Sequence, residues 1–241
     1  MKKLIAAFAL SLLPTLGFAF TGPQTLSANI DLRDQASLQN GARYFMNYCM
    51  GCHSLKYMRY NRMAADLGID DITLRKTFLV GDAKPGDTMT TAVRPEDLET
   101  WFGVPSPDLT LVTRWRSPDW VYTYLKSFYA DPTRPFGVNN LMFPNAAMPH
   151  VLVDLQGLAQ PVMAAHQAGT PVAEGVGPAV GGRLSATQYD TMVRDITAFL
   201  TYAGEPVQLE RQRLGVFVLL FLGLLFIVAY SMKKEFWKDV H

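Results

Sequence analysis

The first regular pattern of apolar and small residues lies just before residue 50. Gly41, Phe45 and Cys49 follow one another at intervals of four, which places them on one face of a helix. Tyr44 and Tyr48 lie on the adjoining face. Because glycine has no Cβ atom, Gly41 allows another helix or a bound group to approach closely. The pattern therefore predicts a helix that leads into Cys49 and packs through its Gly41 face.

A second helical pattern begins at Ser185. Ser185 and Gln188 have the spacing of a capping box, in which each side chain binds the backbone N–H of the other residue. Apolar residues then recur every three or four positions, at Tyr189, Met192, Val193, Ile196, Phe199 and Leu200. Gly204 and Pro206 are typical of the end of a helix. We expect an amphipathic helix whose apolar stripe faces the core.

The stretch between these two helices is rich in proline and glycine. Short helices are predicted at 95–102, where a proline precedes acidic residues, and at 119–128. Prolines interrupt residues 131–149, so we expect this segment to be irregular. Loops of this size inside a compact domain are usually functional. Residues 171–182 are expected to form a flexible surface loop.

Near the C-terminus, residues 214–232 contain no charged side chain and are apolar on every face. A run of this length spans the roughly 30 Å hydrocarbon core of a bilayer as one helix. A buried core helix would carry a polar stripe, and none is present. Arg211 and Arg213 precede the run, while Lys233, Lys234 and Lys238 follow it, which favours a cytoplasmic C-terminus only weakly. We predict a transmembrane helix surrounded by lipid over 214–232.

The N-terminal end has the three parts of a secretory signal peptide. Lys2 and Lys3 precede a short apolar run over 4–16, and Gly17-Phe18-Ala19 is a small-x-small cleavage site. Cleavage after Ala19 is expected, with retention as an anchor the alternative. The predicted organisation is a signal peptide at 1–19, an exported domain at 20–213, the membrane helix at 214–232 and a cytoplasmic tail at 233–241.

The charge balance argues against a nucleic-acid partner. The formal net charge is +1 and the isoelectric point is about 7.8, which provides no basic field. Five lysines lie outside the predicted exported domain, at positions 2, 3, 233, 234 and 238, so the domain itself is net acidic. An acidic surface suits a basic soluble partner, although a solvated surface is the commoner explanation of such a balance.

The candidate chemistry lies in Cys49-Met50-Gly51-Cys52-His53, which contains the only two cysteines of the 241 residues. C-x-x-C-H is the attachment signature of a c-type haem: two thiols bond to one porphyrin and the adjacent histidine ligates its iron. A zinc site would need about four protein ligands, and the sequence offers no second cysteine pair. A thioredoxin-like motif would lie near a strand–helix unit, whereas this motif follows a helical pattern. We therefore predict one covalently bound haem c held by Cys49, Cys52 and His53.

Beyond this motif, three further stretches resemble the cytochrome c1 family, the haem subunits of quinol–cytochrome c oxidoreductase (cytochrome bc1) complexes. The first is the sequence from Cys52 to Arg62, CHSLKYMRYNR. The second is Pro107-Asp108-Leu109-Thr110 followed by Arg114-Trp115-Arg116, and the third runs from Phe199-Leu200 to Gly204-Glu205-Pro206. The resemblance extends from about residue 40 to the C-terminus and is greatest to bacterial members. It implies an all-α, class I cytochrome c-like haem domain with long loop insertions and a single C-terminal transmembrane helix.

The resemblance also implies a second iron ligand. Family members use a methionine in a loop before the last helix of the haem domain, and Met148 occupies the matching position. The residues alone leave this ligand open, because the chain has eleven methionines and methionine commonly fills gaps in cores. Met46, Met50 and Met58 are too near the motif to reach the opposite face of the iron. Met142, Met163 and His150 remain alternatives. His150 is a departure from the family pattern and keeps bis-histidine ligation open.

Two further residues are implied to lie near a haem propionate. Arg116 corresponds to a family arginine that approaches a propionate, where a charge-assisted, bidentate bond explains the choice of arginine. Arg114 is the alternative for this role. Arg116 could also be an exposed surface cation with no role at the haem. Trp120 is a further candidate for the same edge of the haem.

The function implied by the resemblance is single-electron transfer in a respiratory chain. The Rieske iron–sulfur protein would be the electron donor, a soluble cytochrome c the acceptor, and cytochrome b a further partner in the membrane. The expected location is the bacterial inner membrane with the haem domain in the periplasm, and the subunit is not expected to be an enzyme on its own.

Three other functions are weighed against this one. A membrane-anchored cytochrome c that donates to a terminal oxidase or another reductase would lack the stretches after His53 and around Arg116. A haem enzyme such as a peroxidase would need an open iron position. A non-redox scaffold with an incidental motif would not stain for haem.

Overall fold

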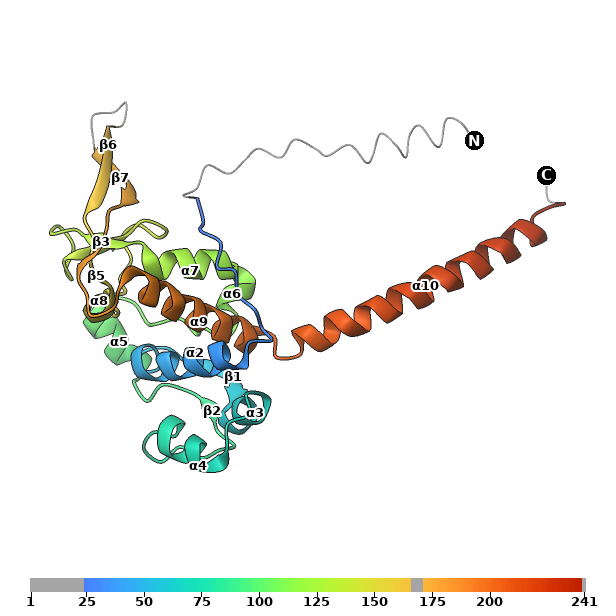
Figure 1. The fold of residues 1–241 in the computed structure, drawn as a ribbon, viewed down its shortest axis with the longest axis horizontal. Helices are drawn as coiled ribbons and strands as arrows, with labels where there is room; N and C mark the ends of the chain where they lie inside the picture. Colours follow the sequence, from blue (N-terminus) through green and yellow to red (C-terminus); the bar gives the residue numbers. More distant parts are fainter. Residues whose placement is uncertain (1–23, 166–170, 240–241) are drawn as a thin grey trace.

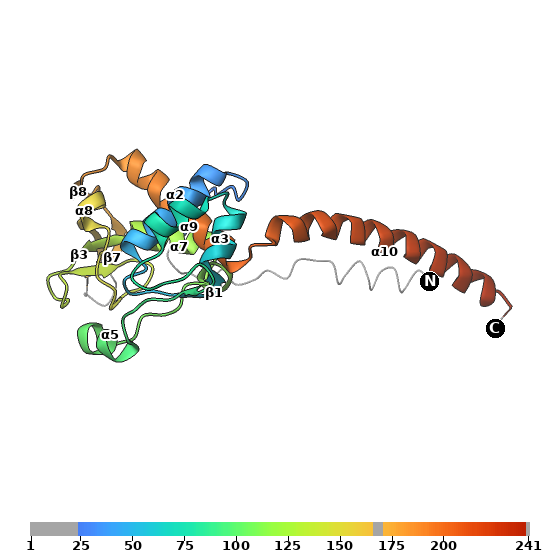
Figure 2. The same ribbon diagram turned by 90° about the horizontal axis from the view of Figure 1, so that it is seen from below.

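The computed structural model describes residues 24–165 and 171–239. Its centre is a pair of crossing helices, α2 (Gln35–Tyr48) and α9 (Ala186–Gly204), which lie against each other in both Figure 1 and Figure 2. The two backbones meet at Gly41, where an added Cβ would lie 2.0 Å from the carbonyl oxygen of Asp195. The expectation that Gly41 admits another helix is confirmed, because any side chain at this position would collide with α9.

Both helices begin with side-chain caps that satisfy free backbone N–H groups. The carboxylate of Asp34 accepts a hydrogen bond from Ser37 N at 3.1 Å at the start of α2. Ser185 and Gln188 form the predicted capping box at the start of α9. The whole predicted stripe of α9 is buried: Tyr189, Met192, Val193, Ile196, Phe199 and Leu200. Its caps and its spacing therefore define this helix as the sequence predicts.

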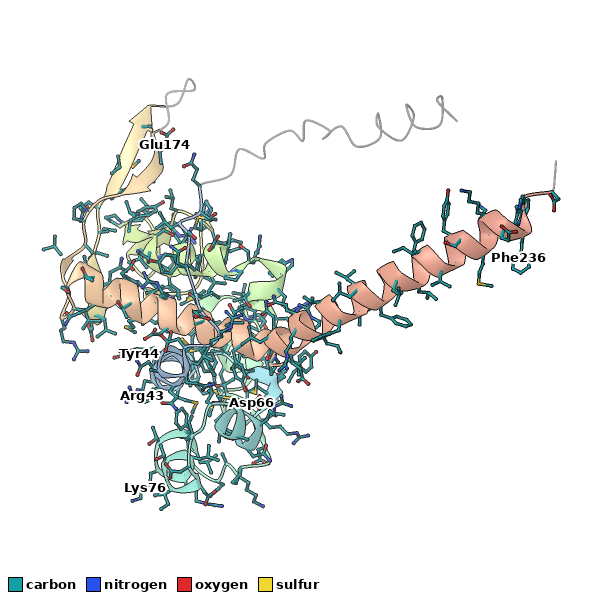
Figure 3. The ribbon with its side chains drawn as sticks, turned by 45° about the vertical axis from the view of Figure 1, so that its right-hand side comes forward. Arg43, Tyr44, Asp66, Lys76, Glu174 and Phe236 are labelled. Carbon is teal, nitrogen blue, oxygen red and sulfur yellow. The ribbon has the colours of Figure 1, made fainter. Side chains whose placement is uncertain are left out.

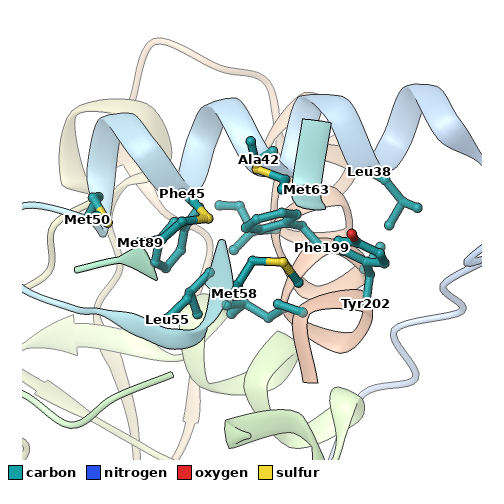
Figure 4. Packing of buried hydrophobic residues seen from close by; sticks show 14 of the residues in the cluster. Leu38, Ala42, Phe45, Met50, Leu55, Met58, Met63, Met89, Phe199 and Tyr202 are labelled. Carbon is teal, nitrogen blue, oxygen red and sulfur yellow. The ribbon is translucent and has the colours of Figure 1, made fainter. Parts of the chain in front are cut away.

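The core around the crossing is filled by aromatic rings and methionines, as Figure 4 shows. The ring centroids of Phe45 and Phe199 lie 5.7 Å apart, and both side chains are fully buried. Met58 and Met63 lie beside these rings and are also buried. Methionine adapts to irregular gaps, so it packs well between two helices whose facing surfaces are aromatic.

Shorter helices surround this pair, and α6 and α7 pack against α9. They are α3 (Tyr60–Asp66), α4 (Asp71–Thr73), the π-helical turn η1 (Leu74–Phe78), α5 (Pro95–Phe102), α6 (Val112–Trp115), α7 (Pro118–Lys126) and α8 (Val153–Gln156). The predicted helix at 95–102 is confirmed with the same bounds, with proline in its first turn and Gly103 at φ 80° as its C-cap. The helix predicted at 119–128 is α7, which ends earlier because Phe128 begins a strand.

Four two-stranded antiparallel sheets lie in the described part of the chain. They pair β1 (Leu55–Arg59) with β2 (Thr88–Met89), β3 (Phe128–Ala130) with β4 (Val138–Asn140), β5 (Gly157–Leu158) with β8 (Val180–Gly181), and β6 (Pro161–Ala165) with β7 (Pro171–Val176). The expectation of a flexible loop at 171–182 was wrong, because β7 and β8 give this segment regular partners. In Figure 1 the β6–β7 hairpin projects from the domain. The helical class itself is confirmed, because helices are the main regular elements of residues 24–165 and 171–239.

The helix α10 (Gln208–Phe236) extends away from the rest of the protein (Figures 1 and 2). Figure 3 shows its side chains projecting on all sides as far as Phe236 near its end. It contains a window with a mean hydropathy of 2.6, none of which is buried, so it is long and apolar enough to cross a membrane. The helix begins at Gln208, before the predicted membrane span at residue 214. Its first turns include charged residues, which the predicted span leaves out. The predicted signal peptide at 1–19 lies outside the described residues.

Candidate haem-binding site

The C-x-x-C-H motif forms a tight turn directly after α2. The carbonyl oxygen of Cys49 accepts hydrogen bonds from Cys52 N at 3.0 Å and from His53 N at 2.9 Å. Cys49 N in turn donates to Phe45 O at 2.9 Å, so the turn continues from the buried end of the helix. Neither cysteine is paired in a disulfide. The turn thus holds the two thiols and the imidazole within one short, fixed piece of backbone.

His53 is buried and oriented by a hydrogen bond to a distant segment. Its Nδ1 donates to the carbonyl oxygen of Pro107 at 2.8 Å, since a carbonyl can only accept. This bond fixes the tautomer and leaves Nε2 with a free lone pair, as second-shell carbonyls do for metal-bound histidines. Burial lowers the pKa of His53, which favours the neutral form that binds metals. His53 is therefore prepared to act as a ligand.

The segment that supplies Pro107 O is joined to the chain just after the motif. Leu109 N donates to Ser54 O at 2.9 Å, and the Asp108 carboxylate accepts from Lys56 N at 2.9 Å. The same carboxylate accepts from Thr110 N at 3.0 Å. The two sequence stretches that carry the family resemblance on either side of residue 100 are thus adjacent in space, and their contact positions the acceptor for His53.

The Cys49 thiol is uncharged in this environment. Burial raises the pKa of the Cys49 thiol to about 12, and the nearby Cys52 adds to the shift. Cys49 also packs against the hydrophobic core. A free thiol pair and a neutral, oriented imidazole fit the donor set that a c-type haem requires.

The other predicted residues form one connected series of contacts. The Arg116 guanidinium carbon lies 4.1 Å from the ring centroid of Trp115 and 5.0 Å from that of Trp120. Trp120 stacks on Tyr124 with ring centroids 5.1 Å apart. The Tyr124 hydroxyl donates to Met148 Sδ at 3.5 Å. The structure thus brings Arg116, Trp120 and Met148 together, and Trp120 and Met148 pack against the same hydrophobic core as Cys49.

Arg116 and Arg114 have different environments. Arg116 Nε is buried and has no hydrogen-bond partner among the described residues, so it has an unused donor. Arg114 instead forms an ion pair with Glu205, which also binds Arg211 in the first turns of α10. Of the two arginines considered for the propionate contact, only Arg114 has a carboxylate partner within residues 24–165 and 171–239.

The alternatives to Met148 as an iron ligand also differ in their surroundings. Met163 lies on the β6 strand of the projecting hairpin and is 51% exposed. Met142 is buried. His150 is buried and stacks on Phe128 with ring centroids 4.8 Å apart, and its Nε2 has no partner among the described residues. Burial lowers the pKa of His150 to about 4, so it is neutral.

Sequence reasoning missed three side chains that hold this region. Tyr124 contacts both Trp120 and Met148; its spacing of four from Trp120 on a helix was the available signal. Burial raises the pKa of Tyr124 to about 12, which keeps its hydroxyl protonated. Asn139 and Asn140 are buried in the predicted irregular segment, and adjacent asparagines in such a segment are typical of side-chain-to-backbone bonding.

These two asparagines organise the segment before Met148. Asn140 Oδ1 accepts from Met142 N at 2.9 Å and from Phe143 N at 3.2 Å, while its Nδ2 donates to Tyr124 O at 2.8 Å. Asn139 Oδ1 accepts from Asn145 N at 2.8 Å. The irregular segment is therefore fixed by amide side chains, although only β4 within it is regular.

Comparison with known proteins shows what this chain is similar to. The model of the cytochrome C1 family matches residues 26–240. The chain is 66% identical over 244 residues to cytochrome c1 of Allochromatium vinosum, with all of both chains covered. It is 40% identical to the ammonia monooxygenase gamma subunit of Nitrosomonas europaea, covering 89% of this chain and 88% of that protein. It is also 26% identical to cytochrome c1 of Rhodospirillum rubrum, covering 86% of this chain and 83% of the relative.

Proposed function

The chain belongs to the cytochrome c1 family, and on that premise we propose the residues that serve its function. It is the haem-carrying electron-transfer subunit of a cytochrome bc1 complex, with cytochrome b and the Rieske protein as the other subunits that this membership implies. It carries one covalently bound haem c and is not an enzyme on its own. When bound, the haem supplies a one-electron iron couple.

We propose that Cys49 and Cys52 would form the two thioether bonds and that His53 and Met148 would ligate the iron. The observation that carries this assignment is the His53 Nδ1–Pro107 O hydrogen bond of 2.8 Å, directly after the only cysteine pair. It presents Nε2, the nitrogen that ligation needs. A methionine opposite histidine gives a higher potential than a second histidine would, which suits an acceptor for the Rieske protein.

Arg116 and Trp120 are proposed to lie at a propionate of the haem. The support is the buried, unpartnered Nε of Arg116 among the described residues and its contact with the Trp120 ring. A guanidinium in contact with two indole rings keeps its donors directed, and a carboxylate would complete them. Arg114 is not needed for this role, because it binds Glu205.

The direction of electron flow and the orientation in the membrane are also proposals. The chain would accept one electron from the Rieske protein and pass it to a soluble cytochrome c in the periplasm. The apolar part of α10 at 214–232 would lie in lipid, with 20–213 outside the cytoplasm and 233–241 inside it. The predicted signal at 1–19 would be removed. A C-terminal tag should then be reached by antibody only in permeabilised cells.

Haem attachment and ligation can be tested on the purified protein. Wild type should retain haem peroxidase staining on denaturing gels, and Cys49→Ser should lose most of it. Met148→Leu should abolish the near-infrared-edge absorption of sulfur–iron ligation, lower the potential and allow carbon monoxide to bind. Met142→Leu is the matched control, because it changes a buried methionine of the same segment. If Met142→Leu or His150→Ala has these effects and Met148→Leu does not, the ligand assignment is wrong.

The place of the chain in a complex can be tested by purification. A tagged chain should bring down cytochrome b and the Rieske protein from membranes. A chain stopped after Gln212 should be exported and released with its haem attached, while quinol-driven reduction of the haem in membranes falls sharply. Co-purification with a terminal oxidase alone would instead support the membrane-anchored cytochrome alternative.

A further inference from the structure

Three aromatic residues at four-residue spacing lead from α7 into β3. Trp120 and Tyr124 stack on α7 with an interplanar angle of 10°, and Phe128 meets the edge of Tyr124 with ring centroids 5.2 Å apart. Phe128 is buried and stacks in turn on His150. The Tyr124 ring is therefore fixed by an aromatic neighbour on each side, which restricts its hydroxyl to one direction.

The backbone of Tyr124 is fixed as well. Its carbonyl oxygen accepts from Asn140 Nδ2 at 2.8 Å, and Asn140 also binds the backbone of the segment that leads to Met148. One side chain thus ties the end of α7 to this segment. This tie and the aromatic stacking hold the Tyr124 hydroxyl 3.5 Å from Met148 Sδ.

We propose that Tyr124 is a positioning residue that fixes the Met148 thioether and raises the reduction potential through a hydrogen bond to its sulfur. This inference rests on the proposed ligation by Met148. Thioether sulfur is a weak acceptor, and a donor beside it withdraws electron density from the lone pairs that bind iron. Weaker donation by a ligand favours the reduced metal, which is how outer-sphere hydrogen bonds tune metal sites.

The alternative is that Tyr124 serves only as a packing residue. Its ring buries apolar surface between Trp120 and Phe128, and phenylalanine would do this equally well. The two roles therefore separate at the hydroxyl. Tyr124→Phe keeps the ring contacts and removes only the donor to Met148.

The test uses the full-length chain in its purified complex, with the potential measured by optical redox titration. In Tyr124→Phe we expect the ratio of reduced to oxidised haem at a fixed ambient potential to fall by roughly threefold to tenfold, which is a shift of about 28 to 59 mV for one electron. We also expect a displaced sulfur–iron absorption band and faster binding of carbon monoxide. A merely structural role would move none of these in a variant that keeps the ring.

The matched control is Tyr122→Phe on the same helix. The Tyr122 hydroxyl donates to Asp190 instead, so its loss should leave the potential unchanged. In the Met148→Leu background, Tyr124→Phe should have no further effect on the potential, because the sulfur acceptor is gone. Equal shifts in both backgrounds would overturn the proposal and indicate a general field effect of the hydroxyl.

Failure of the inference can be told apart from failure of the ligand assignment. If Met148→Leu loses the sulfur–iron band while Tyr124→Phe leaves the potential and the band unchanged, Met148 is the ligand and the role of Tyr124 is refuted. If Met148→Leu keeps the band, the ligand assignment fails and the inference fails with it.

Discussion

The helix pair α2–α9 and the segment 131–149 are held together by different means. The helices meet at Gly41, with no room for even one carbon atom on its backbone, and bury a continuous set of apolar side chains around Phe45 and Phe199. The stability of the helix pair depends on complementary shape and on apolar area removed from water. It provides the cysteines and His53.

The segment 131–149 has little regular structure and is held by a few amide side chains. Asn140 binds two backbone N–H groups and one carbonyl, and Asn139 joins Asn145 N to the Asp131 carboxylate. Here the backbone groups have few secondary-structure partners, so side chains replace them. This segment provides Met148.

The difference indicates how the helix pair and segment 131–149 should each respond to substitution. A change that alters shape at the helix crossing should affect the entire fold, since the core is cooperative. A change that removes one amide from the segment should loosen the Met148 side while the helices stay folded. The proposed axial ligands therefore come from parts of the protein with different local stability.

The largest effect is expected for Gly41→Val. The new Cβ would fall 2.0 Å from Asp195 O and 2.7 Å from Phe199 Cβ, so the helices would have to separate. Overpacking of this severity should reduce the free energy of unfolding by about 3 kcal/mol or more, which is enough to prevent folding in a marginal domain. The measurement is the yield of haem-stained protein in membranes. Gly86→Ala is the control, because no atom lies within 4 Å of its added Cβ.

Asn140→Ala should have the next largest effect. It leaves Met142 N and Phe143 N without their partner in a buried site, at a cost of about 1 to 3 kcal/mol for each group that water cannot reach. It also removes the bond from Asn140 Nδ2 to Tyr124 O, which keeps its bonds from Ser127. We expect carbon monoxide to bind the reduced haem while circular dichroism still reports folded helices. Asn61→Ala is the control, because Asn61 is an exposed residue of α3. If Asn140→Ala unfolds the helices together with the segment, the helix pair and segment 131–149 form one cooperative unit.

The sequence predicts the helix pair α2–α9 better than segment 131–149, because the signals for the helices are local. The capping box at Ser185 and the stripe from Tyr189 to Leu200 need only the order of neighbouring residues. The contacts of segment 131–149 join distant positions. Asn140 forms a hydrogen bond with Tyr124, 16 residues away, and Tyr124 forms one with Met148, 24 residues away. No periodicity reports such pairs. The β6–β7 hairpin was missed for the same reason, since its proline- and glycine-containing strands are defined by pairing rather than by composition.

A smaller, local effect is expected for Arg116→Gln. Removing a cation beside a propionate favours the oxidised haem, so the potential should fall while the ligands stay the same. The size of this term is about 1 kcal/mol for a partly buried charge. Arg114→Gln is the matched control, because its partner is Glu205. An unchanged potential in Arg116→Gln, with a fall in Arg114→Gln, would transfer the role to Arg114.

The smallest effect is expected for Asp195→Asn, which asks whether the helix crossing needs its own polar contact. The Asp195 carboxylate accepts from Ser37 Oγ at 2.6 Å, and burial raises its pKa although this bond partly offsets the shift. The folded protein therefore binds this proton more tightly than the unfolded chain does. Wild-type stability should fall as the pH rises from about 4, the ordinary pKa of aspartate, through the raised value in the fold.

Asparagine removes this titration and still accepts the bond from Ser37. Asp195→Asn should thus gain stability relative to wild type as the pH rises over that window, with no gain at lower pH. Urea unfolding of the detergent-solubilised chain at several pH values measures the difference, and Glu174→Gln on the exposed hairpin controls for net charge. A loss of stability in Asp195→Asn at neutral pH would mean that the ionised carboxylate stabilises the helix crossing. The helix pair would then depend on a specific polar contact, as segment 131–149 does.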